Sequence, residues 1–152
     1  MRYIILLGFF LGSLYAVPLH QGDRLAMISL KDQHGLMHYL DENISKIIVT
    51  YDKKSSLIAH KFIQTHTNAA DYLQKHHILC VADISHVPSV ISKVFILPKI
   101  RKYPYPILLI MDTKKRIFGY VKKKIALYDL KDGVIEKISY ADSQKSLQIL
   151  LK

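Results

Sequence analysis

The chain has 152 residues, half of them hydrophobic, and its formal net charge is +10 at pH 7. This length predicts one compact domain rather than several. Cys80 is the only cysteine, which excludes a disulfide within the chain, and the six scattered glycines exclude a glycine-rich phosphate loop.

The first sixteen residues have the pattern of a secretory signal peptide. Arg2 supplies a positive charge, an apolar stretch follows from Tyr3 to Tyr15, and the small Ala16 precedes Val17. The apolar stretch is shorter than the ~20 residues of a comfortable membrane span. We therefore expect cleavage near Ala16 and a periplasmic or secreted domain of residues 17–152, with an uncleaved N-terminal anchor as the alternative.

The first half of the sequence predicts strands that alternate with helices. In order, the expected elements are a strand at 26–30, one or two helical turns at 36–43, a strand at 46–51, a helix at 55–64, a second helix from Asn68 to about His76 and a strand at 78–83. The strand at 46–51 is rich in β-branched residues, and Ser55 or Ser56 is the expected N-cap of the helix after it.

The second half is richer in strands. The expected elements are a helix from Ser89 to Leu97 stopped by Pro98, a strand at 107–111, a strand-like run at 117–121, a hairpin of 125–130 and 134–140, and a final helix capped by Asp142. Lys131-Asp132-Gly133 is a good hairpin turn. This order predicts a mixed sheet covered on both faces.

Three segments resemble the thioredoxin-like superfamily, in particular its peroxiredoxin-like and TlpA-like branches. They are Leu30 to Gly35, Tyr105 to Asp112 together with Gly119 to Val121, and Ile125 to Ile135, the last of which also resembles exported YtfJ-like bacterial proteins. The resemblance implies an α/β fold, a thioredoxin-like three-layer α/β/α arrangement with a central mixed sheet.

The chain departs from that superfamily at the position of its reactive cysteine. Active members carry the cysteine where the first long strand meets its helix, and here Lys53, Lys54, Ser55 and Ser56 fill that junction. A serine hydroxyl is a far poorer nucleophile without a general base. The resemblance therefore implies a scaffold without dithiol or peroxidatic chemistry, with Ser55 and Ser56 marking the vacant position.

The family's cis-proline has two candidate positions in this sequence. One alignment places its slot near Lys123 or Lys124, where no proline stands. A shifted alignment makes Pro106 the cis-proline and puts the strand 107–111 beside the active loop. The sequence leaves the choice open.

Cys80 and the histidines supply two further hypotheses. Cys80 lies in a run typical of a buried strand, where a thiol packs as a small hydrophobe, but an accessible Cys80 would make this a single-cysteine redox enzyme. Eight histidines are present without a recognisable metal-ligand spacing. We expect no metal and no cofactor.

Basic residues suggest a binding surface. The candidate binding residues are Lys53, Lys54, Lys99, Arg101, Lys102 and Tyr103. The segment from Pro88 to Lys102 joins an apolar helix face to a basic end, which suits a protein partner or an anionic surface, whereas a core-packed crossover helix is the alternative. We expect another exported or envelope protein as partner, an anionic polymer or membrane surface as the second choice, and no nucleic acid.

Overall fold

The computed structural model describes residues 17–25 and 28–152. The predicted signal peptide lies outside the described residues, as do the first two residues of the strand expected at 26–30. Over the part of the chain that is described, no helix is long and apolar enough to cross a membrane.

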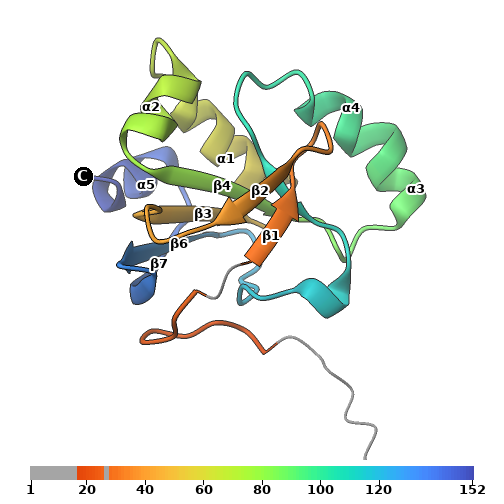
Figure 1. The fold of residues 1–152 in the computed structure, drawn as a ribbon. Helices are drawn as coiled ribbons and strands as arrows, with labels where there is room; N and C mark the ends of the chain where they lie inside the picture. Colours follow the sequence, from red (N-terminus) through yellow and green to blue (C-terminus); the bar gives the residue numbers. More distant parts are fainter. Residues whose placement is uncertain (1–16, 26–27) are drawn as a thin grey trace, which may run out of the picture.

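A five-stranded mixed sheet forms the centre of the domain, in the order β5-β4-β3-β6-β7 (Figure 1). Its strands are β3 (Lys46–Thr50), β4 (Ile78–Asp83), β5 (Leu108–Ile110), β6 (Ile125–Lys131) and β7 (Val134–Ala141). β3, β4 and β5 are parallel, whereas β6 pairs antiparallel with both β3 and β7. The strands predicted at 46–51 and 78–83 and the hairpin around Gly133 are confirmed.

Helices α1 (Lys53–Ile63), α2 (Ala69–Lys75), α4 (Leu97–Ile100) and α5 (Gln144–Leu150) pack against one face of this sheet. The short α3 (Ser89–Ile91) and the π-helical η1 (Ser92–Ile96) lead into α4, and a 3-10 turn, η2 (Thr113–Lys115), follows β5 (Leu108–Ile110). The apolar side chains of the four packed helices share one core with the helix-facing residues of the strands, including Ile48, Cys80 and Leu127. When successive parallel strands are added on the same side of a sheet through right-handed crossovers, the crossover helices lie on the same face.

The other face is covered by a hairpin and by irregular chain. β1 (Ile28–Lys31) and β2 (Met37–Leu40) pair antiparallel and lie across the front of the sheet in Figure 1. Their buried side chains join Leu25 and Phe118 in a second core against the strands. The predicted α/β class with a central mixed sheet covered on both faces is confirmed, and among the described residues the layer on this face contains no α-helix.

The helical turns predicted at 36–43 are wrong, because this segment forms β2. The Asp32 carboxylate accepts hydrogen bonds from the N–H groups of His34 (2.8 Å) and Leu36 (3.0 Å), and Gly35 adopts a positive φ of 86°. These contacts close a tight turn that returns the chain along β1. Pairing with β1 and burial of Leu40 then outweigh the local preference for helix.

Pro98 does not stop the crossover helix, which runs without a break from Ser89 to Ile100. Proline lacks an N–H and its ring excludes the carbonyl group four residues earlier. The helix accommodates this by widening into the π turn η1, where the Leu97 N–H donates to the Ser92 carbonyl. Pro98 itself stands in the first turn of α4, where its missing N–H costs little.

Two smaller predictions in the second half also need correction. Residues 117–121 form no strand, and this segment is held instead by single contacts such as Leu19 N–H to Ile117 O (2.7 Å). The final helix is capped by Ser143 rather than by Asp142, since the Ser143 hydroxyl accepts from the Ser146 N–H.

Candidate functional site

Helix α1 begins directly after β3 with a complete capping box. Asp52, rather than Ser55 or Ser56, is the N-cap, because its carboxylate accepts from the Ser55 N–H at 2.9 Å. The same carboxylate accepts from the Lys123 N–H at 2.7 Å. Burial opposes ionisation of Asp52, but these two N–H groups hold its pKa below the usual range. The junction is therefore a closed hydrogen-bonded corner.

Ser55 is a structural residue in this corner. Its side chain is completely buried, and its Oγ accepts from the N–H groups of Tyr51 (3.1 Å) and Asp52 (3.2 Å) while it donates to the Asp52 carbonyl (3.1 Å). Ser56 is half-buried and faces the cavity described below. Of the two serines that mark the vacant cysteine position, only Ser56 is presented to a ligand.

The sheet order decides between the two alignments for the proline slot. The strands beside β3 are β4 and β6, whereas β5, which follows Pro106, lies at the edge of the sheet. The chain segment next to the α1 corner is therefore the one before β6, and the Lys123 N–H contact with Asp52 shows it directly. All peptide bonds of the described residues are trans.

Cys80 is buried in the core between the sheet and the helices. Burial raises the pKa of its thiol to about 12. A thiol in that environment is almost entirely protonated at neutral pH, and the thiolate is the nucleophile in redox chemistry. The structure places Cys80 as a core residue, in agreement with the buried strand expected from the sequence.

A groove opens at the carboxyl ends of β3 and β4, on the helix-covered face. Its cavity of about 460 Å³ lies between the first turns of α1, the loop after β4, and the crossover helix from η1 to α4. Its lining residues are Thr50, Tyr51, Asp52, Lys53, Ser56, Leu57, Ala82, Ile84, His86, Val87, Phe95, Ile96, Lys99, Ile100, Tyr103 and Ile107. The volume falls within the range of small-ligand and side-chain pockets.

The groove has apolar walls and a positively charged rim. Leu57 and Phe95 are exposed at 39% and 70%, so the walls present apolar surface to solvent. Lys53 and Lys99 stand at the rim, and neither forms an ion pair within the described chain. A concave apolar surface with a few charged groups can bind a peptide side chain.

The predicted binding residues divide into two sets. Lys53, Lys99 and Tyr103 line the groove together, although they come from α1 and from the end of the crossover. Arg101 lies outside it, where its Nε donates to the Gln33 carbonyl at 3.0 Å. Lys54 and Lys102 are exposed outside the groove.

Sequence reasoning missed the apolar half of the site. The sequence predicts Leu57 only as part of the helix at 55–64, and Ile84 and His86 are not among the predicted binding residues. The crossover helix also leaves Val90, Ile91, Val94 and Phe95 exposed instead of packing them in the core. One signal was present in the sequence, since no Asp or Glu occurs from Ile84 to Met111.

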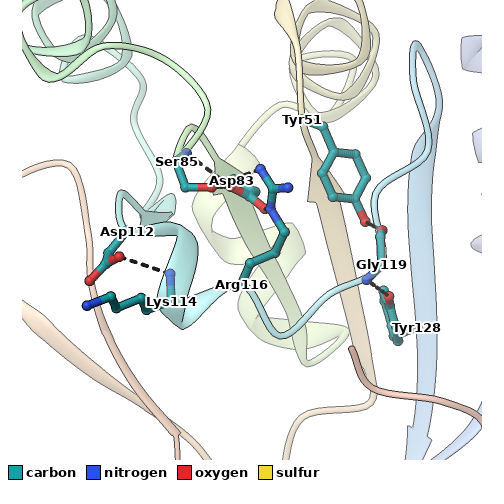
Figure 2. Close-up of polar contacts among 8 residues, drawn as sticks. All are labelled: Tyr51, Asp83, Ser85, Asp112, Lys114, Arg116, Gly119 and Tyr128. Atoms are coloured by element: carbon teal, nitrogen blue, oxygen red, sulfur yellow. Dashed lines mark hydrogen bonds and ion pairs between the residues drawn. The ribbon is translucent and has the colours of Figure 1, made fainter. Parts of the chain in front are cut away.

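A buried ion pair anchors the loop that forms one wall of the groove (Figure 2). Asp83 at the end of β4 is fully buried and accepts from Arg116 Nε at 2.8 Å. Ser85 completes the cluster, because its hydroxyl donates to Asp83 (2.6 Å) and accepts from Arg116 Nη2 (3.0 Å). The cluster fixes the chain on either side of Ile84, which lines the groove.

Two tyrosines hold the neighbouring segment in place. Figure 2 shows Tyr51, which directly follows β3, and Tyr128 from β6 meeting Gly119. The Tyr51 hydroxyl donates to the Gly119 carbonyl, and the Tyr128 hydroxyl accepts from the Gly119 N–H at 3.1 Å. These contacts replace the strand pairing expected for residues 117–121 and keep Arg116 in reach of Asp83.

An aromatic network supports the other wall of the groove. His60 on α1 is buried, its Nδ1 lies 2.8 Å from the Tyr105 hydroxyl, and its ring stacks on Tyr103 at 3.5 Å between centroids. Tyr103 lines the groove directly. Burial lowers the pKa of His60, and the nearby Lys99 charge lowers it further.

This network predicts a pH-dependent stability. Since the folded-state pKa of His60 lies below its ordinary value of about 6.5, the unfolded chain binds the proton first. The stabilisation by neutral His60 is therefore complete above pH ~6.5 and is lost as the pH falls below it, with a slope of up to about 1.4 kcal/mol per pH unit. Urea unfolding between pH 7.5 and 5 measures this slope.

His60→Phe keeps the stacking on Tyr103 and should remove this part of the pH dependence, whereas His34→Asn, at an exposed position, should retain it. Equal slopes for the wild type and His60→Phe would contradict the assignment.

Over the residues that the structure describes, no three His, Cys, Asp or Glu side chains are grouped to hold a metal ion.

Comparison with known proteins identifies the fold. No family model and no curated protein sequence matches the chain. Solved structures do match: the thioredoxin domain of a thiol-disulfide oxidoreductase from Bacteroides vulgatus has a TM-score of 0.50 at 14% identity, over 88% of this chain and 99% of that one.

Two further structures agree. Peroxidoxin BcpB from Mycobacterium tuberculosis has a TM-score of 0.52 at 14% identity, over 86% of this chain and 93% of that one. A thio-disulfide isomerase from Thermus thermophilus has a TM-score of 0.51 at 12% identity, over 88% and 95%. These likenesses and the sheet order together show that this single-cysteine protein has a thioredoxin-like fold.

Proposed function

We propose that this chain is an exported thioredoxin-fold protein that binds a segment of another exported or envelope protein in the groove between α1 and the crossover helix. In this proposal the protein carries out no dithiol or peroxidatic chemistry. The observation that carries the proposal is the groove itself, which is open, apolar and basic beside a junction that contains no thiol.

The chemistry of the junction supports a binding role. The Ser55 hydroxyl already forms the hydrogen bonds of the capping box, and the pKa of the buried Cys80 thiol is raised to about 12. By contrast, Leu57 and Phe95 leave apolar surface uncovered on both sides of the cavity. Exposed apolar patches of this kind mark interaction sites in soluble domains.

Export is the part of the proposal that rests on the sequence alone. The N-terminal pattern of Arg2, an apolar stretch and Ala16 supports it. N-terminal sequencing of the protein recovered from the exported fraction should begin at Val17. A product that retains Met1 and stays with the membrane would contradict cleavage.

The absence of redox chemistry is tested first. We expect the purified protein to show no turnover of hydrogen peroxide or of insulin disulfides above the buffer, and Cys80→Ser to give the same result. A thiol probe should react with Cys80 only after denaturation, because the side chain is buried. Turnover that disappears in Cys80→Ser would overturn the proposal in favour of a single-thiol redox enzyme.

Peptide binding is tested by selection from a displayed random-peptide library against the purified protein. We expect selected peptides to lose at least about tenfold in affinity for Phe95→Asp, since a charge on the groove wall opposes burial of an apolar side chain. Fluorescence anisotropy measures the affinity. The matched control is Ile149→Asp on α5, which alters a similarly exposed residue outside the groove.

Two outcomes count against the groove. Selection that yields no binder overturns the peptide-binding function. The other outcome is selection of peptides whose affinity falls equally for Phe95→Asp and Ile149→Asp, or is unchanged in both variants. Either result would mean that the peptides bind outside the groove and would overturn the assignment of the site.

A further inference from the structure

The charges around the groove indicate which peptides it takes. We propose that the groove recognises a short extended segment in which large apolar side chains stand next to carboxylates. The apolar side chain enters the cavity, and the carboxylates pair with Lys53 and Lys99. This inference rests on the proposed function and specifies the chemistry of the partner.

The two lysines are available for such a partner. Asp52 is the single acidic residue of the lining, and its carboxylate already accepts from the N–H groups of Ser55 and Lys123. Neither Lys53 nor Lys99 has an ion-pair partner within the described residues. The groove thus carries two ammonium groups that form no ion pair with the described residues, against one carboxylate that is already hydrogen-bonded to the backbone.

The start of α1 adds to the positive potential. The first turn of this helix contains Lys53 and Lys54 and no acidic side chain. Positive charges at a helix N-terminus are unfavourable, and an anion there is favourable. The N-cap Asp52 already supplies one carboxylate, and a partner carboxylate beside Lys53 would pair with the charge that the two exposed lysines add.

The crossover segment extends the same field over the opposite wall. No acidic residue occurs from Ile84 to Met111, whereas Lys93, Lys99, Arg101 and Lys102 all lie within this range. A surface of one sign raises the local concentration of the opposite charge and speeds association. An acidic segment is therefore favoured over a neutral or basic one before it reaches the groove.

The shape favours a peptide over a bilayer surface. The apolar contacts lie on two walls, with Leu57 on α1 and Phe95 on the crossover helix, and on a floor formed by Ala82 of β4 and by Ile84, which directly follows β4. A flat surface would touch the crossover helix without reaching this floor. A protruding side chain from a peptide reaches both walls and the floor.

The test uses four fluorescein-labelled hexapeptides and the purified full-length protein. Their cores are Glu-Phe-Leu-Glu, Gln-Phe-Leu-Gln, Lys-Phe-Leu-Lys and Glu-Ser-Ser-Glu. We expect the first to bind in anisotropy titrations at low salt, the second to bind at least about fivefold more weakly, and the last two to show no binding. Binding of the first should weaken as salt rises, because the partner charges are at the surface.

Charge reversal tests the two lysines. The double variant Lys53→Glu/Lys99→Glu should no longer bind the Glu-flanked peptide and should bind the Lys-flanked peptide instead. Lys54→Glu/Lys102→Glu makes the same change of net charge outside the groove and should keep the original order of affinities. Thermal unfolding of both double variants verifies that each remains folded.

The outcomes separate this inference from the proposed function. Equal affinity for the Glu-, Gln- and Lys-flanked peptides, with all three lost in Phe95→Asp, overturns the carboxylate preference and leaves a peptide-binding groove. No binding of any peptide, together with Phe95-dependent binding to phosphatidylglycerol vesicles, overturns both and assigns the surface to a membrane.

Discussion

Replacing Arg116 by Met is expected to destabilise the protein by about 3 kcal/mol, the lower end of the cost of breaking a buried ion pair. Asp83 is fully buried, and Arg116 Nε at 2.8 Å is its charged partner. Removal of the guanidinium leaves that carboxylate with the Ser85 hydroxyl and N–H as its remaining donors among the described residues. Urea unfolding at pH 7 measures the loss.

The double variant Asp83→Asn/Arg116→Met is the control, because it removes both charges together. It should recover a large part of the stability that Arg116→Met loses, since an unpaired buried charge costs more than a neutral pair. Arg116→Lys should fall between the wild type and Arg116→Met, as one ammonium cannot bridge Asp83 and Ser85 in the geometry of the guanidinium. A loss below about 1 kcal/mol in Arg116→Met would contradict the role of the ion pair.

The Arg116→Met variant also tests whether the ion pair holds the wall of the groove in place. Ser85 stands between Ile84 and His86, both of which line the cavity. Where Arg116→Met remains folded, the loop after β4 should be less rigid and the peptide affinity lower. The peptide affinity therefore measures how well the loop after β4 is held in place, while urea unfolding measures what the ion pair contributes to stability.

Introducing a cysteine at Ser56 is expected to create a reactive thiol, whereas Ser55→Cys should give a protected thiol and a less stable protein. Ser56 faces the groove in the first turns of α1, close to Lys53. A helix N-terminus and a neighbouring cation stabilise a thiolate and lower its pKa. In a Cys80→Ser background, the pH dependence of alkylation by iodoacetamide measures this pKa.

The comparison between the two positions follows from their contacts. Ser55 Oγ accepts two backbone N–H groups and is completely buried, so Ser55→Cys should cost about 1–3 kcal/mol through unsatisfied donors. Ser139→Cys, a half-buried position on β7, serves as the matched control for Ser56→Cys. Alkylation at pH 7 that is no faster for Ser56→Cys than for Ser139→Cys would contradict the electrostatic argument.

Local signals in the sequence were sufficient for much of the sheet. β-branched runs predicted β3 and β4, and Lys131-Asp132-Gly133 predicted the β6–β7 hairpin, because these elements depend on side-chain type and turn chemistry. Prediction failed for residues 36–43 and 117–121, whose conformations are set by contacts with other segments. A tight turn pairs the first segment with β1, and Tyr51 and Tyr128 hold Gly119 in the second.

The sequence by itself determined three properties of this protein: no cysteine stands at the strand-to-helix junction, no internal disulfide exists, and no acidic residue lies from Ile84 to Met111. Only the tertiary structure decided that Asp52 caps α1, that Cys80 is buried, and that Lys53 and Lys99 line the same apolar groove. The reason is physical. Composition and charge are properties of the chain, whereas burial and the meeting of distant side chains depend on how the crossover helix packs against the sheet.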